Sequence, residues 1–128
     1  MGLKLTIAPG ERLIIGTAVV KNNGSKMELE IENDVPVIRG KDILSPKDVI
    51  TPCQRIYYEL QVLYLGGKLE DVYVQDYWAA VKPVVEAAPS LTLIIHEINS
   101  LVLSGKFYQA LKAAKKLLAE EERLISNA

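Results

Sequence analysis

Few residues in this chain combine a reactive side chain with the partners that its chemistry requires. His96 is the sole histidine, and it precedes Glu97. A His-Glu pair can begin a metal site, but a protein metal site needs several converging ligands. The chain has no second histidine, and Cys53 is its single cysteine. We therefore expect a structural or surface role for His96 and no metal site.

Cys53 is the other candidate for chemistry, because it falls in the first turn of a predicted helix, where a thiolate is favoured. A catalytic thiolate also needs a base partner, and none is identifiable. Gly10 and Gly16 do not form a phosphate-binding loop, and no Gly-Lys-Ser or Gly-Lys-Thr triplet occurs. We expect no catalytic residue, no cofactor and no enzyme.

The charged residues are nearly balanced, with 15 basic and 16 acidic side chains and a net charge of −1. This balance argues against a strongly basic nucleic-acid coat protein but leaves room for a local basic face. Lys112, Lys115 and Lys116 read as a solvated helix face, with nucleic-acid contact as the alternative. The acidic run 120–122 is most simply solvated too. The helical aromatic residues, among them Tyr73, Tyr77 and Trp78, suit core or interface packing better than base stacking.

Length and hydropathy favour a small globular protein. The 128 residues suit one domain or one domain with an appendage, and 49% are hydrophobic. A single cysteine cannot form an internal disulfide, which suits a reducing compartment. No stretch approaches the roughly 20 apolar residues that span a bilayer. We expect a cytoplasmic protein that does not enter membranes.

The elements that must position any site change in type near residue 44. Strands are predicted at residues 3–7, 12–15, 17–21, 26–32 and 35–39, from alternating apolar residues between turn signals. Asn23-Gly24 is a strong signal for a two-residue hairpin, since both turn positions prefer positive φ. These five short strands form a small antiparallel β module over residues 1–44, with a thin core.

Residues 45–128 read as a helical domain of about four helices, which makes the fold α+β. Helices are predicted at residues 52–65, 69–88, 90–103 and 106–125, after a short helical piece that Ser45 and Asp48 begin as a capping box. Thr51 caps the first long helix, and Pro83 should kink or split the second. The last two should form a hairpin that buries Ile94, Ile98, Leu111 and Leu118.

The first third of the chain resembles the carbon storage regulator family of small RNA-binding dimers. The resembling features are PGERLIIG, with its Gly-Glu turn and Ile-Gly stop, and a strand that ends in Val-x-Val-x-Arg, here VPVIR. In that family the strand arginine contacts an RNA loop that contains GGA, and Arg39 is the matching position. The first strand also lines the family's site, which implies Lys4 and Leu5. The chain departs from the family at Ile38, where histidine is usual, and before the Gly-Glu turn, where basic residues are usual.

Nearly the whole chain is similar to FlbT, a family of regulators of flagellin synthesis. The resemblance is carried, in order, by LKLTIAPGERLIIGTAVV, IENDVPVIRGKDIL, TPCQRIYYELQVLYL and AAPSLTLIIHEINSLVLSGKFYQALKAAKKLL. It implies post-transcriptional control through association with the 5′ untranslated region of flagellin mRNA, altering its decay or translation, with repression as the expected direction. Flagellin and a companion flagellar regulator of translation are the implied protein partners. We expect no binding to DNA.

Two hypotheses follow. In the first, Arg39, Lys41, Lys4 and Arg12 form a small basic face on a sheet that binds RNA, with Arg39 as an exposed reader. Taken without the resemblance, Arg39 is an ordinary edge-strand charge. In the second, Tyr73, Tyr77 and Trp78 form a partner-binding face of a protein adaptor or chaperone-like module that affects the mRNA indirectly. We also expect a homodimer held through the strand half.

Overall fold

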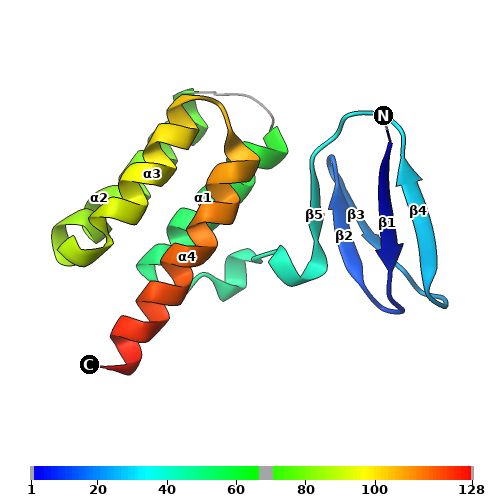
Figure 1. Ribbon diagram of the computed structural model, residues 1–128, viewed down its shortest axis with the longest axis horizontal. Helices are drawn as coiled ribbons and strands as arrows, with labels where there is room; N and C mark the ends of the chain where they lie inside the picture. Colours follow the sequence, from blue (N-terminus) through cyan, green and yellow to red (C-terminus); the bar gives the residue numbers. More distant parts are fainter. Residues whose placement is uncertain (1, 67–70, 128) are drawn as a thin grey trace. The chain divides into compact units, whose positions relative to one another are not determined.

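The computed structural model describes residues 2–66 and 71–127, except for the side chains of residues 71–73. It confirms the α+β architecture, with antiparallel strands first and helices after them (Figure 1). The chain divides into two compact units, Met1–Ile43 and Leu44–Ala128. We call them the strand unit and the helical unit. Within the described residues, no helix is both long and apolar enough to cross a membrane.

The strand unit holds five strands in two small antiparallel sheets. The strands are β1 (Leu3–Ile7), β2 (Arg12–Ile15), β3 (Ala18–Lys21), β4 (Met27–Ile31) and β5 (Val37–Arg39). One sheet pairs β1 with β4, and the other has the order β3-β2-β5. The predicted strands are thus confirmed, although the last three are shorter than the sequence pattern suggested.

The core of the strand unit is thin, as the sequence predicted. Leu5 and Ile7 of β1 pack with Leu13 of β2, and partly buried side chains from both sheets surround them. Leu5 lies opposite Leu29, which packs against this core, whereas Met27, opposite Ile7, is exposed. The alternation of apolar and polar residues along β1 therefore determines which face turns inward.

The predicted hairpin at Asn23-Gly24 is wrong, because β3 and β4 belong to different sheets. Neither turn residue has a positive φ; among the described residues only three other glycines do. The preceding residue, Asn22, redirects the chain instead. Its buried side-chain amide donates to the carbonyls of Ile7 (3.2 Å), Ala8 (3.1 Å) and Ser25 (3.0 Å), and its oxygen accepts from the Gly24 amide (3.0 Å). This local turn directs the chain from one sheet into the other.

The helical unit contains α1 (Pro52–Gly66), α2 (Asp71–Ala87), α3 (Thr92–Leu103) and α4 (Phe107–Ser126). Short 3₁₀ turns occur at Gly40–Asp42 in the strand unit and at Pro46–Asp48 and Pro89–Leu91 in the helical unit. Helix α1 packs against α2 and α4, and α3 packs against α4. The predicted hairpin of the last two helices is confirmed, with Ile98 and Leu111 buried and Ile94 and Leu118 half-buried.

The helix starts and the internal proline follow the sequence only in part. Thr51 caps α1 as predicted: its hydroxyl accepts from the Gln54 amide (3.2 Å), and the Gln54 side chain accepts from the Thr51 amide (2.9 Å). Ser45 makes no side-chain cap, because the segment after it is a single 3₁₀ turn closed by backbone bonds. Pro83 does not split α2. It lies on an exposed position, where water can reach the carbonyl that loses its partner.

Candidate nucleic-acid interface

The guanidinium of Arg39 is already engaged within the strand unit. Its Nε donates to Glu11 Oε2 at 2.8 Å, and its Nη2 donates to Glu11 Oε1 at 2.9 Å and to the Thr6 carbonyl at 2.7 Å. The side chain of Arg39 is 34% exposed. The expectation that Arg39 is a freely exposed strand arginine is therefore corrected, because its guanidinium joins β5 to β1 and to the turn that follows β1. RNA contact by Arg39 stays a prediction.

Glu11 is suited to hold Arg39, since its carboxylate also accepts a hydrogen bond from the Ala8 backbone amide at 3.1 Å. The hydrogen bond from Arg39 and then the bond from Ala8 lower the pKa of the Glu11 carboxyl below its usual value. The same pairing raises the pKa of Arg39, chiefly through the hydrogen bond to Glu11. Both groups are charged at neutral pH, so they neutralise each other.

Two cations lie side by side at the end of the three-stranded sheet. Arg12 of β2 is directly opposite Lys21 of β3 in the antiparallel register, and both side chains are exposed. Like charges in this position destabilise a strand pair unless an anion joins them. Within residues 2–66 and 71–127, the structure shows no ion pair to either one.

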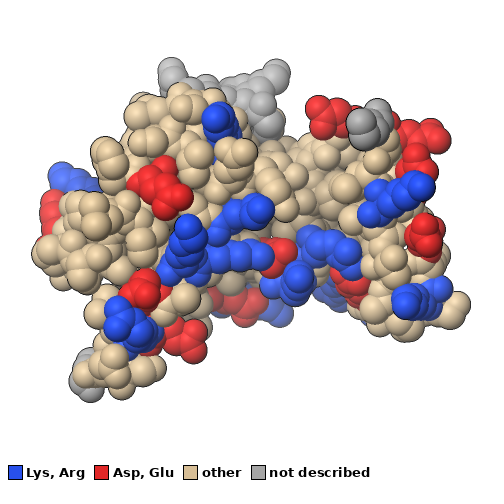
Figure 2. Space-filling view, in the orientation of Figure 1, with Lys and Arg blue, Asp and Glu red and all other residues tan. Residues whose placement is uncertain are grey.

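Lys41 is a third cation close to this end of β2. It follows Gly40, where an added Cβ would lie only 2.7 Å from the Arg12 carbonyl oxygen, so the chain passes close to β2. Lys41 is exposed, and its charge acts on the Glu11 carboxylate. We call Arg12, Lys21 and Lys41 the basic group. Figure 2 shows that this face of the strand unit carries basic side chains with acidic side chains among them.

The other two residues proposed for the RNA face, Lys4 and Leu5, lie on β1 in the two-stranded sheet. Lys4 is opposite Glu30, and the next exposed pair on that sheet is Thr6 with Glu28. This surface is therefore partly acidic. Leu5 is a core residue, so its side chain does not line a surface. The structure thus separates the predicted basic residues, keeping Arg12 and Lys41 together and placing Lys4 on another sheet.

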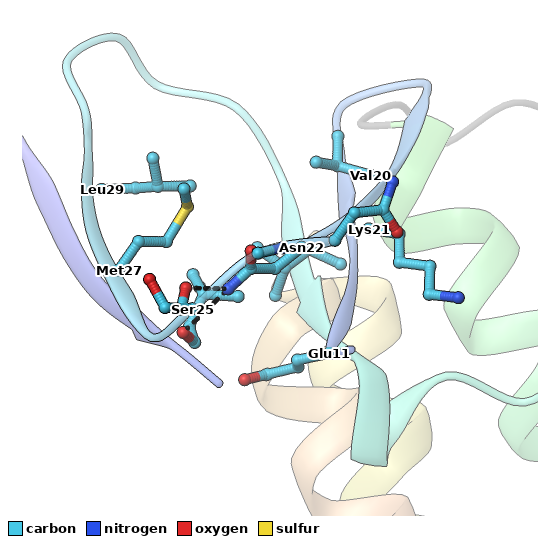
Figure 3. A pocket seen from close by; sticks show the side chains of 11 residues that line it. Glu11, Val20, Lys21, Asn22, Ser25, Met27 and Leu29 are labelled. Atoms are coloured by element: carbon cyan, nitrogen blue, oxygen red, sulfur yellow. Dashed lines mark hydrogen bonds between the residues drawn. The ribbon is translucent and has the colours of Figure 1, made fainter. Parts of the chain in front are cut away.

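A cleft of about 470 Å³ opens between the two sheets beside β3 and β4. Leu13, Val20, Met27 and Leu29 give it apolar walls, and Glu11 and Lys21 contribute polar atoms. Figure 3 shows Lys21 extending away from Met27 and Leu29, and the Asn22 amide turned toward Ser25. The cleft exists because β3 and β4 do not pair, so both of its walls end in a strand edge.

The aromatic residues predicted to bind a partner do not form one exposed face. Tyr77 is fully buried, and its hydroxyl donates to Asn99 Oδ1 at 2.5 Å. Burial raises the pKa of that hydroxyl. Trp78 is half-buried and lies edge-on to Tyr77, with ring centres 5.0 Å apart. Tyr77 thus belongs to the core, and the Tyr73 side chain lies outside the described residues. Tyr108 of α4, 51% exposed, is the more accessible ring.

Glu121 has a structural role that its place in the acidic run did not suggest. Its Oε1 accepts from the Thr51 hydroxyl at 2.5 Å, and its Oε2 accepts from the Cys53 amide at 3.0 Å. It therefore caps the start of α1 from the last turns of α4. Burial, and then the nearby Glu121 carboxylate, raise the pKa of the Cys53 thiol to about 12. The expected thiolate is corrected, because these effects outweigh the helix start.

Sequence reasoning missed three residues that shape this region: Lys21, Gly40 and Asn22. Lys21 could be identified only from the β2–β3 register, which places it opposite Arg12. Gly40 could be identified only from the close approach of the chain to β2. Asn22 carried a weak signal, since Asn before Asn-Gly favours a side-chain turn. As for metals, no group of three His, Cys, Asp or Glu residues able to hold an ion occurs in the described part of the chain.

Comparison with known proteins gives one family over nearly the full length. Residues 3–125 match the sequence model of the family described as flagellar protein FlbT. The chain is 38% identical to the "probable flagellum biosynthesis repressor protein FlbT 1" of Bradyrhizobium diazoefficiens, over 97% of this chain and 85% of that protein. It is 35% identical to the similarly named protein of Rhodopseudomonas palustris, over 98% of this chain and 99% of that protein. The "flagellum biosynthesis repressor protein FlbT" of Caulobacter vibrioides is 30% identical, over 97% and 90%. No solved structure matches the chain.

Proposed function

Because this chain belongs to the FlbT family of flagellar proteins, we propose that it represses flagellum biosynthesis by associating with flagellin mRNA. Its relatives are named repressors of flagellum biosynthesis. In the proposed mechanism the protein acts in the cytoplasm as a regulator and not as an enzyme. It associates with the 5′ untranslated region of the message and alters its decay or translation.

The observation that carries the RNA-binding part is the basic group of Arg12, Lys21 and Lys41. Arg12 and Lys21 are opposite each other and exposed, and the nearby carboxylate, Glu11, is held by Arg39. Two facing cations without an acid between them cost stability in the free protein. A phosphate between them would remove that repulsion, so the arrangement suits a nucleic-acid backbone.

This geometry supports binding through a few phosphates of a single strand. Lys contributes a compact charge and Arg a planar set of donors, which together can hold neighbouring phosphate oxygens. With three contacts, log affinity should fall with log salt at a slope of about −2, from roughly −0.7 per phosphate in single strands. Arg39 contributes indirectly in this proposal, by neutralising Glu11.

The test is fluorescence anisotropy of labelled flagellin leader RNA titrated with the parent chain and with three variants. Arg12→Ala, Lys21→Ala and Lys41→Ala should each weaken binding and reduce the salt slope by about 0.7. The matched control is Lys4→Ala, which removes an exposed strand lysine from the other sheet. Equal effects of Lys4→Ala and Lys21→Ala would show that only net charge matters. Unchanged binding in all three variants would refute the proposed interface.

A second candidate function is the protein adaptor, in which flagellin or a companion flagellar regulator binds the helical unit and the mRNA is affected indirectly. The favouring observation is the exposed Tyr108 ring, which lies 5.4 Å from Tyr64 and 5.6 Å from the Lys112 ammonium. Tyrosine is enriched in interface hot spots. Gel shifts on the leader with and without flagellin would separate the two, since an adaptor alone shifts no RNA.

The homodimer through the strand unit stays part of the proposal. All four residues of β3 are exposed, and Val19 is 71% exposed on a strand with an open edge. Open apolar edges favour strand pairing with another chain. Light scattering should give roughly twice the 14.2 kDa chain mass. Val19→Lys should return the protein to the monomer, and a parent that is already monomeric would exclude the dimer.

A further inference from the structure

The helical unit contains an apolar groove that no residue of the proposed RNA interface touches. It has a volume of about 300 Å³. Its walls come from the start of α1, the C-terminal half of α2, the turn before α3, and the last turns of α4. Helices α2 and α4 both pack against α1, so the groove lies where two helices flank a third.

The lining of the groove is apolar apart from the carboxylate of Glu121. Its apolar lining residues include Val84, Leu91, Leu124 and Ile125. Leu124 is 39% exposed and Ile125 is 60% exposed, on the final turn of α4. Adjacent exposed aliphatic side chains beside a concave apolar surface mark a site of association more often than a free surface.

The charges next to these walls are mainly acidic. Glu86 precedes the lining residue Ala87, Glu121 lines the groove itself, and Glu122 follows Glu121. Arg123 is ion-paired with Glu120, because its Nε donates to Glu120 Oε2 at 3.1 Å. Figure 2 shows acidic and basic side chains together near the C-terminal end of α4, and further basic ones along its middle. Lys82 lies one turn before Glu86. Among the described residues near the groove, it is the one cation for which the structure shows no ion pair to a carboxylate.

An α-helix is the form of ligand that suits this groove. Grooves between two helices receive an amphipathic helix through aliphatic residues at positions i, i+3, i+4 and i+7. Acidic residues beside the groove complement basic residues on the flanks of such a helix, which raises the association rate and selects the partner. Helices α1, α3 and α4 of this chain bury most of their large apolar residues in their own bundle, although Leu93 and Leu103 of α3 are exposed. We therefore take a separate protein as the source of the helix, and a second copy is one outcome of the test.

We propose that the groove is a docking site for a basic amphipathic helix of a partner protein. Aliphatic residues of that helix would pack against Val84, Leu91 and Leu124, and its Lys or Arg residues would face Glu86 and Glu122. This site goes beyond RNA binding by the strand unit, and its test leaves the basic group of Arg12, Lys21 and Lys41 unchanged.

The experiment measures binding of two synthetic helix-forming peptides to the full chain by fluorescence anisotropy. Both peptides carry Leu at helical spacing; one has Lys on its flanks, and its twin has Glu. The Lys peptide should bind more tightly than the Glu peptide. Leu124→Asp should weaken the Lys peptide about tenfold or more, as expected for losing an apolar anchor. The matched control, Leu103→Asp, changes a Leu of α3 that is 67% exposed and should leave binding unchanged.

A charge-reversal variant separates docking from general apolar adhesion. Glu122→Lys should move the preference toward the Glu peptide by about tenfold, while circular dichroism shows an unchanged helix content. Equal binding of both peptides, or equal effects of Leu124→Asp and Leu103→Asp, would overturn the proposal. A halving of the solution mass by Leu124→Asp would overturn it as well, because the groove would then hold a second copy.

Discussion

Replacing Asn22 with Asp exchanges the side-chain NH2 group for an oxygen at a buried position of the strand unit. The Asn22 Nδ2 donates to three carbonyls, those of Ile7, Ala8 and Ser25, at 3.0–3.2 Å, and the residue is buried. The shape of the side chain is conserved, so packing is not disturbed. The substitution turns every one of these attractions into a contact between a carboxylate and a carbonyl oxygen.

The cost follows from the hydrogen-bond count. An amide has two N–H donors, so the three contacts amount to two hydrogen bonds, one of them shared. Each hydrogen bond whose acceptor is left without a donor costs about 1–3 kcal/mol, so the loss of two gives about 2–6 kcal/mol before any repulsion from the new charge. A unit of the size of Met1–Ile43 typically has about 2–6 kcal/mol of stability in total. Asn22→Asp should therefore unfold most of the strand unit at room temperature.

The assay is amide hydrogen exchange in β1 and β4, combined with urea unfolding. Exchange in both strands should rise by orders of magnitude in Asn22→Asp. Asn23→Asp introduces the same charge at the adjacent exposed position and should change stability by less than about 0.5 kcal/mol. Equal protection of β1 and β4 in the two variants would refute the assignment of Asn22 as the residue that joins the sheets.

Four further outcomes follow from the structure. Arg39→Ala should lower the melting temperature, because the substitution removes two hydrogen bonds to Glu11 and one to the Thr6 carbonyl. The same substitution at an exposed strand arginine without such bonds would leave the melting temperature nearly unchanged. The lowered pKa of Glu11 means that its contribution to stability is present above its ordinary pKa of 4.5 and is lost as the pH falls below that value; Glu11→Gln should remove this acid dependence of the melting temperature. Ile98→Asp should cost about 3–5 kcal/mol in urea unfolding, because it buries an unpaired carboxylate between α3 and α4. Cys53 should react with a thiol reagent at pH 8 only after unfolding, since it is buried and its pKa is about 12; fast reaction of the folded chain would contradict this.

The sequence was informative wherever a property belongs to a single segment. Alternation along residues 3–7 predicted both the strand and its buried face, and Thr51 predicted the cap of α1. The short break between the last two helices predicted their pairing, and apolar spacing predicted that Ile98 and Leu111 are buried. These features depend on periodicity and on side chains that bond to their own backbone neighbourhood, so the order of residues is sufficient to find them.

For the candidate site, the sequence pointed to Arg12 and Lys41 but not to their setting. Arg39 was expected to face solvent, yet its guanidinium is held by a carboxylate 28 positions earlier in the chain. The adaptor hypothesis placed Tyr77 on a partner-binding face, yet it is buried and its hydroxyl donates to Asn99 of α3. In each case the partner is remote in sequence, and no local pattern names it.

What the sequence determined alone is therefore the type and approximate position of the helices and strands, and the α+β order. The tertiary structure decided which strand edges meet. Asn22 bonds to carbonyls 14 and 15 positions away, which takes β4 away from β3, opens the cleft and leaves Lys21 beside Arg12. The hairpin signal at Asn23-Gly24 depends on two residues, whereas the buried amide of Asn22 satisfies three carbonyls. The long-range bonds prevail because a buried carbonyl without a donor costs more than a favourable turn contributes.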